Sequence, residues 1–99
     1  MTEDENDRWH LSLAAAATRS LREGPPRGLP LHAATAVAEF LYGPLLDNPH
    51  RLGKPLEREL AGYRAARRGP YRIIYRIDDD KSQVHVVRIE HRADVYRHR

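Results

Sequence analysis

The chain has 99 residues, of which 17 are basic and 14 acidic, giving a formal net charge of +3. This length supports one domain, and the absence of cysteine excludes a disulfide framework, a cysteine-ligated zinc site and thiol catalysis. No apolar run reaches the roughly 18 residues that a membrane-spanning helix needs, so we expect no membrane partner. The acidic first residues do not resemble a secretory signal, and we expect a cytoplasmic protein.

The positive charge is concentrated in the second half of the chain. Residues 51–99 carry 13 basic and 7 acidic side chains. Fifteen of the 17 basic residues are arginine, whose planar guanidinium group matches the geometry of a phosphate. This asymmetry indicates an anionic partner such as nucleic acid.

The N-terminal part of the chain predicts a strand followed by a helix. Residues 1–8 include four acidic side chains, and we expect a flexible acidic start that precedes a single domain over residues 9–99. Apolar and polar residues alternate over residues 9–13, which predicts a strand. Residues 14–23 are rich in helix formers, and the glycines and prolines of residues 24–28 end that helix.

A second helix is predicted from Pro30, which suits the first turn of a helix. Apolar residues then recur at intervals of three and four: Leu31, Ala34, Val37, Ala38, Leu41 and Leu45. Gly43 and Pro44 interrupt the pattern, so we expect the helix to end or kink near Tyr42. Residues 47–55 contain many turn-forming residues and predict an ordered loop.

The last half of the chain predicts three strands. Residues 60–68 and 71–77 form a hairpin through the turn at Gly69 and Pro70, and the two strands of residues 71–77 and 83–89 flank a second turn. Apolar residues on both faces of residues 83–89 predict an interior position in the sheet. Residues 91–99 are a basic tail with room for one helical turn.

The predicted element order is therefore β-α-α-β-β-β. Packing two amphipathic helices on one sheet buries the apolar stripes of both layers. We expect an α+β fold with a small four-stranded antiparallel sheet and two N-terminal helices packed on it.

Arginines on two neighbouring strands are candidate anion-binding residues. Arg72 and Arg76 flank Ile74 on one face of a strand, where successive side chains lie about 7 Å apart and the two arginines about 13 Å apart. Arg64, Arg67 and Arg68 lie on the preceding strand, and the hairpin brings Arg67 or Arg68 close to Arg72. Like charges at such positions repel unless an anion lies between them. An ordinary solvated strand face is the alternative interpretation.

The C-terminal segment adds His91, Arg92 and Tyr96 after the last strand. The imidazole of His91 suits acid–base chemistry, although a half-buried histidine at the end of a strand is an equally simple interpretation. The run Asp78–Asp80 is a poor metal site, because consecutive strand or turn residues point in different directions. We expect no metal and no cofactor.

Three sequence motifs resemble the RelE/ParE toxin superfamily. They are Gly-Pro-Tyr-Arg-Ile-Ile-Tyr at residues 69–75, Ile-Glu-His-Arg-Ala-Asp-Val-Tyr at residues 89–96, and Asn-Pro-His-Arg-Leu-Gly-Lys-Pro-Leu at residues 48–56. They occur in the same order and at similar spacing as in RelE-type members. The resemblance covers the chain from about Trp9 to Tyr96 and implies the same α+β fold.

The resemblance implies a RelE-type mRNA interferase of a type II toxin–antitoxin system. Such toxins are metal-independent endoribonucleases that cleave mRNA in the ribosomal A site, through attack of a 2′-hydroxyl on the adjacent phosphate. By resemblance, Arg72, Arg92, Tyr96 and His91 are the catalytic candidates. The same resemblance makes the other arginines, namely Arg64, Arg67, Arg68 and Arg76, candidates for binding RNA.

The implied partners are mRNA, the ribosome and a RelB-like antitoxin, through which the toxin contacts DNA only indirectly. The sequence departs from ribosome-dependent members in two places: Ala65 and Ala66 stand in a region where those members carry lysines, and Glu90 stands where some relatives have a basic residue. Two alternatives therefore stay open. One is a ParE-like inhibitor of DNA gyrase, and the other is a degenerate toxin that does not cleave RNA.

Overall fold

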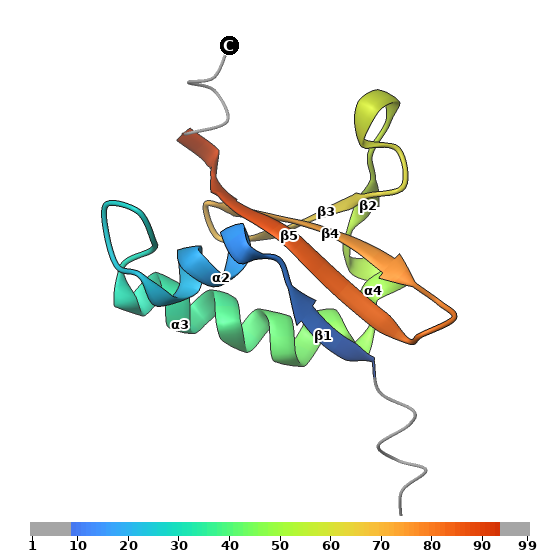
Figure 1. Ribbon diagram of the computed structural model, residues 1–99, viewed down its shortest axis with the longest axis horizontal. Helices are drawn as coiled ribbons and strands as arrows, with labels where there is room; N and C mark the ends of the chain where they lie inside the picture. Colours follow the sequence, from blue (N-terminus) through green and yellow to red (C-terminus); the bar gives the residue numbers. More distant parts are fainter. Residues whose placement is uncertain (1–8, 94–99) are drawn as a thin grey trace, which may run out of the picture.

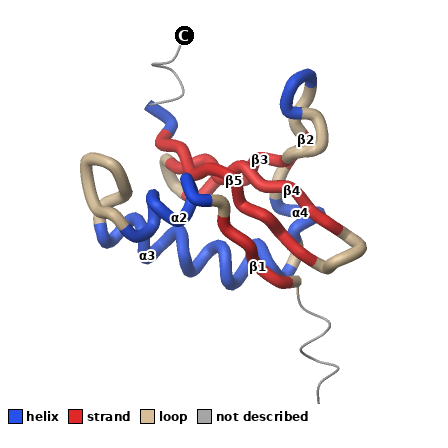
Figure 2. Tube along the Cα trace, in the orientation of Figure 1, coloured by secondary structure: helices blue, strands red, loops and turns tan. Residues whose placement is uncertain are grey.

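The computed structural model describes residues 9–93, and in that range a single five-stranded sheet is packed against helices (Figures 1 and 2). The strands are β1 (His10–Leu13), β2 (Lys54–Pro55), β3 (Arg64–Arg68), β4 (Tyr71–Asp78) and β5 (Gln83–His91). The α-helices are α2 (Ala15–Arg22), α3 (Leu31–Phe40) and α4 (Pro49–Leu52). This arrangement confirms the predicted α+β class. The expected acidic start at residues 1–8 and the end of the basic tail at residues 94–99 lie outside the described residues.

The sheet differs from the predicted one in its strand count and in one pairing. The strand order is β1-β5-β4-β3-β2, with β2 a two-residue strand at the edge. The pairings among β2, β3, β4 and β5 are antiparallel, whereas β1 runs parallel to β5. The prediction of a wholly antiparallel, four-stranded sheet was therefore wrong. Alternation identifies a strand but not its partner, and the long connection through the helices permits a parallel pairing. The predicted interior position of β5 is confirmed.

The sequence predicted that the helix from Pro30 ends or kinks near Tyr42, and the regular α-helix α3 does end close to that point, at Phe40. The chain then continues in a π-helical turn at Leu41–Leu45, which contains Pro44. A proline lacks a backbone N–H and cannot complete a regular α-helical turn, and a wider π turn is a common way to accommodate such an interruption. Leu41 and Leu45 consequently stay on the buried side of the helix.

The loop expected at residues 47–55 contains the short helix α4 and strand β2, and β3 begins four residues later than predicted. A single 3-10 turn, η2 (Arg58–Leu60), takes the place of the first part of that strand. Gly62 follows it with a φ of +95°, which is a left-handed conformation that glycine adopts without strain. The segment from η2 to Gly62 therefore bends out over the sheet before β3 begins.

The core lies between the sheet and helices α2 and α3. Its fully buried side chains include Val37, Leu41 and Leu45 from the helical layer, and Ile73, Tyr75, Val84 and Val86 from the sheet. Burial of each such aliphatic side chain contributes about 1.5–3 kcal/mol. This packing fixes which face of β4 and β5 turns inward and therefore which side chains the opposite face presents.

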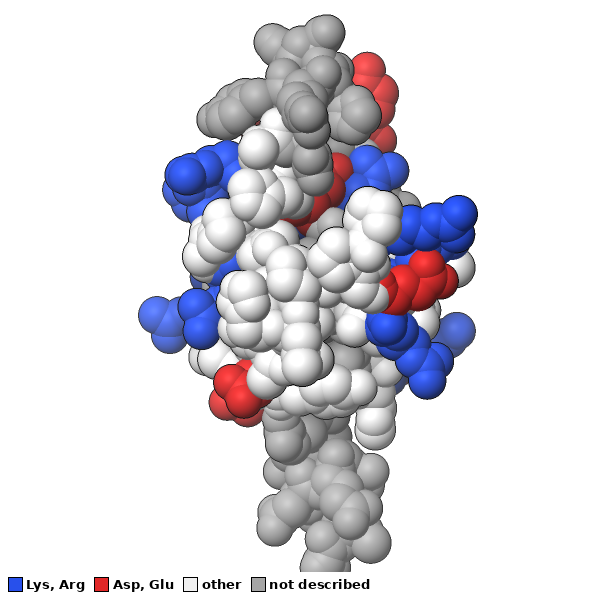
Figure 3. All heavy atoms as spheres, turned by 90° about the vertical axis from the view of Figure 1, so that its left-hand side faces the viewer, with Lys and Arg blue, Asp and Glu red and all other residues white. Residues whose placement is uncertain are grey.

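Basic side chains lie on both flanks of the end of the molecule where α2 and α3 are joined, and uncharged residues occupy its centre (Figure 3). Within residues 9–93, no helix is long and apolar enough to cross a membrane.

Candidate functional site

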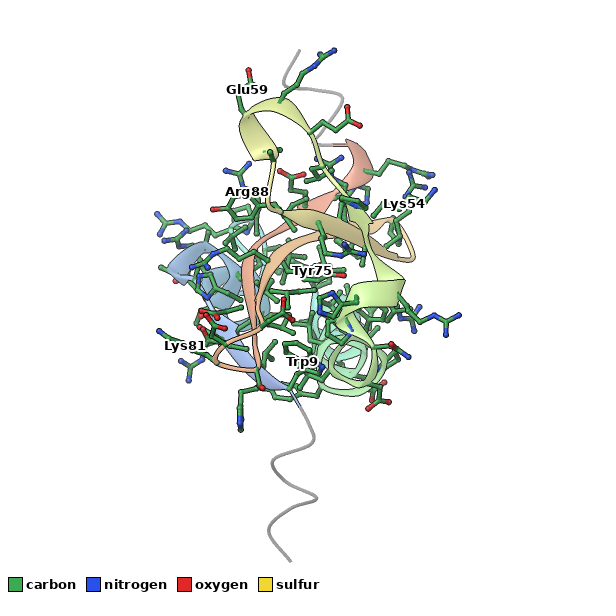
Figure 4. The ribbon with its side chains drawn as sticks, turned by 90° about the vertical axis from the view of Figure 1, so that its right-hand side faces the viewer. Trp9, Lys54, Glu59, Tyr75, Lys81 and Arg88 are labelled. Carbon is green, nitrogen blue, oxygen red and sulfur yellow. The ribbon has the colours of Figure 1, made fainter. Side chains whose placement is uncertain are left out.

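The face of the sheet opposite α2 and α3, here called the open face, presents a group of charged side chains. Arg72 of β4 lies directly opposite Arg67 of β3 and Glu90 of β5. Ile74, two positions further along β4, lies opposite Arg88. Directly opposite residues share a face, so these five side chains belong to one surface. Arg88 and Tyr75 accordingly lie on opposite sides of the sheet in Figure 4.

The open face contains a hollow of about 400 Å³. The segment with η2 forms one wall through Glu59, Leu60 and Tyr63, and Figure 4 shows Glu59 standing above the sheet. The other lining residues are Ala16, Arg72, Ile74, Val87, Arg88 and Glu90. The hollow therefore combines an apolar floor with two guanidinium groups and two carboxylates, Glu59 on the wall and Glu90 beside the arginines. The arginines and the apolar floor suit a ligand with both a flat apolar part and an anionic part.

Arg72 and Arg88 both contact the same carboxylate. The Nε atom of Arg72 lies 3.4 Å from Oε1 of Glu90, and Nη1 of Arg88 donates a 2.9 Å hydrogen bond to Oε2. The Glu90 side chain is 18% exposed, compared with 34% for Arg72 and 65% for Arg88. The carboxylate is thus the most buried member of the three, and both arginine side chains are partly exposed.

A β-bulge places Arg88 and Glu90 on the open face. Tyr75 pairs with Val86 and Ile74 pairs with Arg88, so Val87 has no partner on β4. Beyond this extra residue the alternation of β5 is reversed, which is how a bulge redirects side chains. Arg88 was missed as a site residue in the sequence, because strict alternation places it on the same face as Val84 and Val86. The adjacent valines at positions 86 and 87 are the signal that indicates the bulge.

Arg64 does not join the arginines of the open face. It lies opposite Tyr75, and its Nη2 atom donates hydrogen bonds of 2.6 Å to the backbone oxygens of His50 and Gly53. The hydroxyl of Tyr75 donates a 2.7 Å bond to the backbone oxygen of Pro49. A Cβ at Gly53 would collide with that hydroxyl, so the backbone approaches Tyr75 as closely as only glycine allows. Arg64 and Tyr75 together hold the α4 turn against the sheet.

The remaining sequence-predicted arginines divide between the two faces. Arg67 lies opposite Arg72, and Arg76 lies opposite His85, whose Nδ1 is 2.8 Å from the hydroxyl of Ser12. These positions are on the open face. Arg68 lies opposite Tyr71, on the face that carries the helices. The structure therefore groups Arg67, Arg72 and Arg76 on one surface and separates Arg64 and Arg68 from it.

His91 and Arg92 lie at the end of β5, away from the Arg72 side chain. His91 pairs with Tyr71 on the helix side of the sheet, and the two rings meet edge to face with centroids 5.2 Å apart. The Nδ1 atom of His91 accepts a 3.0 Å bond from the backbone N–H of Ala93. Arg92 is exposed, and its backbone N–H donates to the oxygen of Pro70. Tyr96 lies outside the described residues.

No three His, Cys, Asp or Glu side chains within residues 9–93 come together in a way that would hold a metal ion, and the acidic residues Asp78–Asp80 are no exception. The chemistry that the open face offers is therefore fixed positive charge beside an apolar floor, with one carboxylate, Glu90, held between two guanidinium groups.

Comparison with known proteins identifies the family. A family profile described as "ParE toxin of type II toxin-antitoxin system, parDE" matches residues 12–96. The chain belongs to the RelE/ParE toxin superfamily. Toxin RelG of Mycobacterium tuberculosis is 53% identical over 89 residues, which cover 90% of this toxin and 97% of that protein. Toxin RelE of the same organism is 46% identical over 89 residues, covering 90% and 87%. The chain is thus a RelE-like toxin of a type II toxin–antitoxin module.

Solved structures agree with this assignment. The toxin resembles a chain of the RelBE2 toxin–antitoxin complex from Mycobacterium tuberculosis with a TM-score of 0.74 and 46% identity, over 88% of this toxin and 94% of that chain. It resembles the isolated Escherichia coli RelE toxin with a TM-score of 0.66 and 19% identity, over 91% and 93%. A chain of the ParDE system of Pseudomonas aeruginosa matches with a TM-score of 0.60 and 21% identity, over 84% and 95%. The last two likenesses concern the fold alone.

Proposed function

We propose that this RelE-like toxin is a metal-independent endoribonuclease that cleaves mRNA in the ribosomal A site. The observation that carries the proposal is the partly exposed side chain of Arg72, which lines the hollow of the open face and has Arg67 directly opposite it. The similarity to toxins named RelE and RelG supports the choice of RNA as the substrate.

The proposed reaction is attack of a ribose 2′-hydroxyl on the adjacent phosphate, which expels the 5′-oxygen of the next nucleotide. The products are a 2′,3′-cyclic phosphate and a 5′-hydroxyl. Negative charge gathers on the non-bridging phosphate oxygens in the transition state, and a fixed cation aimed at that charge typically contributes about 3–4 kcal/mol. Arg72 has this role in our proposal. The apolar floor at Ile74 and Val87 supports a base beside the phosphate.

Proton transfer requires a group other than Arg72, because a guanidinium stays protonated and is a poor base. The family resemblance implies that Tyr96 and Arg92 also take part in catalysis, and we include both residues in the proposed site. The position of His91 supports an anchoring role more than a catalytic one, since its ring lies against Tyr71 on the helix side of the sheet. A test of His91 as an acid or base would measure the pH profile of cleavage in a His91→Gln variant.

The proposed partners are a RelB-like antitoxin, mRNA and the ribosome. Complementary charge speeds protein association and steers an acidic chain toward a basic surface. An acidic segment of the antitoxin that covers Arg67, Arg72 and Arg76 would block the surface proposed for RNA. The solved relatives in complex with antitoxins, RelBE2 and the archaeal RelE–RelB pair, support an antitoxin as partner. Contact with DNA is then indirect, through the antitoxin.

The test is to induce the toxin alone in cells and to map the 5′ ends of cellular mRNA. We expect cuts phased with codons, and we expect Arg72→Ala to reduce cleavage by about 10²–10³-fold because it removes a donor to the transition state. Arg51→Ala is the matched control, because Arg51 is exposed on α4 and lies outside the hollow. Equal losses in both variants would contradict the assignment of Arg72.

The same experiment separates the alternatives. The match to a ParE profile favours a gyrase inhibitor as the second candidate, and this toxin would leave mRNA intact while broken DNA accumulates. The third candidate is a toxin that binds RNA without cleaving it, and the contact between Arg72 and Glu90 favours it. Such a toxin would give neither cut mRNA nor broken DNA.

A further inference from the structure

Glu90 stands out on the open face, because a carboxylate would be expected to weaken a surface that binds RNA. Its neighbours across the sheet and along the strand are Arg72 and Arg88, and Arg67 lies beyond Arg72. The three arginines and Glu90 have a combined formal charge of +2. Among the acidic residues that line the hollow, Glu90 contacts the arginines whereas Glu59 is exposed on the η2 wall.

The contact with Arg72 is electrostatic and lacks a hydrogen bond. Nε of Arg72 and Oε1 of Glu90 face each other at 3.4 Å, both are shielded from solvent, and neither has a hydrogen-bond partner within residues 9–93. A buried donor and acceptor left in this state cost free energy compared with a well-formed bond. The Arg88 contact is different, because its 2.9 Å bond to Oε2 is well formed. Glu90 is thus anchored to Arg88 and held loosely by Arg72.

A phosphate presents the same features that Glu90 offers to these arginines. Both are anions with oxygen acceptors arranged for a guanidinium fork, and charge-assisted hydrogen bonds of this kind are among the strongest in proteins. An RNA phosphate that approaches Arg72 from the hollow meets a guanidinium whose Nε already faces a carboxylate. Tight binding of that phosphate requires Glu90 to move away or to share the cation.

We propose that Glu90 is a resident anion that occupies the Arg72–Arg88 pair and yields to an RNA phosphate. This inference rests on the proposed RNA-binding role of the open face. Glu90 acts as a positioning residue: in the absence of RNA it keeps two guanidinium groups side by side over the hollow, where they would otherwise repel each other. It also lowers the affinity for RNA, because each phosphate must compete with it.

The test measures binding of a single-stranded RNA oligonucleotide with 2′-O-methyl groups, which lacks the attacking hydroxyl. We expect Glu90→Gln to bind this probe about fivefold more tightly than the wild-type toxin at low salt. The logarithm of affinity should also fall more steeply with the logarithm of salt concentration, by about 0.7 for one additional phosphate contact on a single strand. A purely structural role of Glu90 would leave this slope unchanged.

Two matched variants separate the effect of losing the Glu90 contacts from the effect of losing one negative charge. Glu39→Gln removes one negative charge from an exposed position on α3, and Glu23→Gln removes one from an exposed position at the end of α2, both outside the hollow. We expect less than a twofold change in affinity for each. In an Arg88→Ala background, where Glu90 loses its anchor, the effect of Glu90→Gln should shrink to less than twofold.

Inorganic pyrophosphate is a second probe, which does not depend on the biological target of the toxin. If Glu90→Gln binds neither pyrophosphate nor the RNA more tightly than the wild type, the inference is overturned, whatever the 5′-end mapping gives. If mRNA is not cleaved but Glu90→Gln binds both probes more tightly, the inference about Glu90 is supported and the proposed function is contradicted. Thermal unfolding of each variant identifies any loss of the fold. Glu90→Asp keeps the negative charge and should bind the RNA with an affinity within twofold of the wild type.

Discussion

Arg64 and Arg72 lie on neighbouring strands, and both are partly buried, but their surroundings differ in kind. Arg64 donates to two backbone oxygens of the α4 turn, on the face that carries the helices. Among the described residues, the polar contact of Arg72 is with a carboxylate, at a distance too long for a good hydrogen bond, on the open face. In the first arrangement, two neutral backbone acceptors that cannot leave hold the Nη2 end of the guanidinium group, although the buried Nε of Arg64 has no partner among the described residues. The second arrangement leaves Arg72 able to exchange one anion for another.

This difference explains why position in the sheet matters more than residue type. Both residues are arginines in a basic segment, and composition alone cannot separate them. The register places Arg64 opposite Tyr75 and Arg72 opposite Arg67. The face that a side chain occupies therefore decides whether it stabilises the fold or remains available to a ligand.

The largest effect on stability is expected for Arg64→Ala. The substitution removes two hydrogen bonds from a charged donor and leaves the oxygens of His50 and Gly53 without that partner. Each such bond contributes about 1.5–3 kcal/mol, and we expect the free energy of unfolding to fall by about 3 kcal/mol. Chemical denaturation measures this change.

Arg72→Ala is the comparison variant for the same experiment. The Arg72 side chain is 34% exposed and its contact with Glu90 is not a hydrogen bond, so we expect the unfolding free energy of this variant to change by less than about 1 kcal/mol. A similar loss of stability in both variants would contradict the division of the two arginines into a structural and a ligand-binding role.

A smaller loss of stability is expected for Tyr75→Phe. Tyr75 is fully buried, and its hydroxyl bonds the oxygen of Pro49 in the same turn that Arg64 holds. The variant keeps the ring and loses one buried hydrogen bond, which corresponds to about 1–2 kcal/mol. Denaturation of the double variant with Arg64→Ala then tests whether the two contacts hold one unit. If they do, the combined loss should be smaller than the two single losses added together.

Much of the fold was predictable from the sequence, because local patterns determine it. The alternation of Tyr71–Ile77 defined β4, and the doubled valines in β5 correctly predicted an interior strand. The parallel pairing of β1 with β5 was not predictable, since no local pattern specifies the partner of a strand. An interruption of the helix near Tyr42 was predictable from Gly43 and Pro44, but its form was not, because local sequence does not specify the π-helical turn at Leu41–Leu45 that carries the chain past Pro44.

The candidate site was only partly predictable, for a reason that one residue illustrates. With strict alternation, Arg88 and Glu90 would point toward the helices together with Val84 and Val86. The extra residue Val87 reverses that order and brings both charged side chains beside Arg72. The pairing of β3 with β4 has no such insertion, and its regular alternation places Arg64 and Arg68 on the other face. One inserted residue in β5 thus decides that Arg88 and Glu90 belong to the open face.

The finest test of the comparison uses two arginines that are adjacent in the chain. Arg67 and Arg68 are both exposed, but Arg67 lies opposite Arg72 on the open face and Arg68 lies opposite Tyr71 on the helix side. We expect Arg67→Ala to weaken binding of the 2′-O-methyl RNA by about fivefold and to lower its salt slope by about 0.7, which corresponds to one lost phosphate contact. Arg68→Ala should change the affinity by less than twofold. Because the two variants remove the same charge from neighbouring positions, any difference between them reports the face and not the net charge. Equal losses would mean that the RNA follows the end of the β3–β4 hairpin and contacts both faces there.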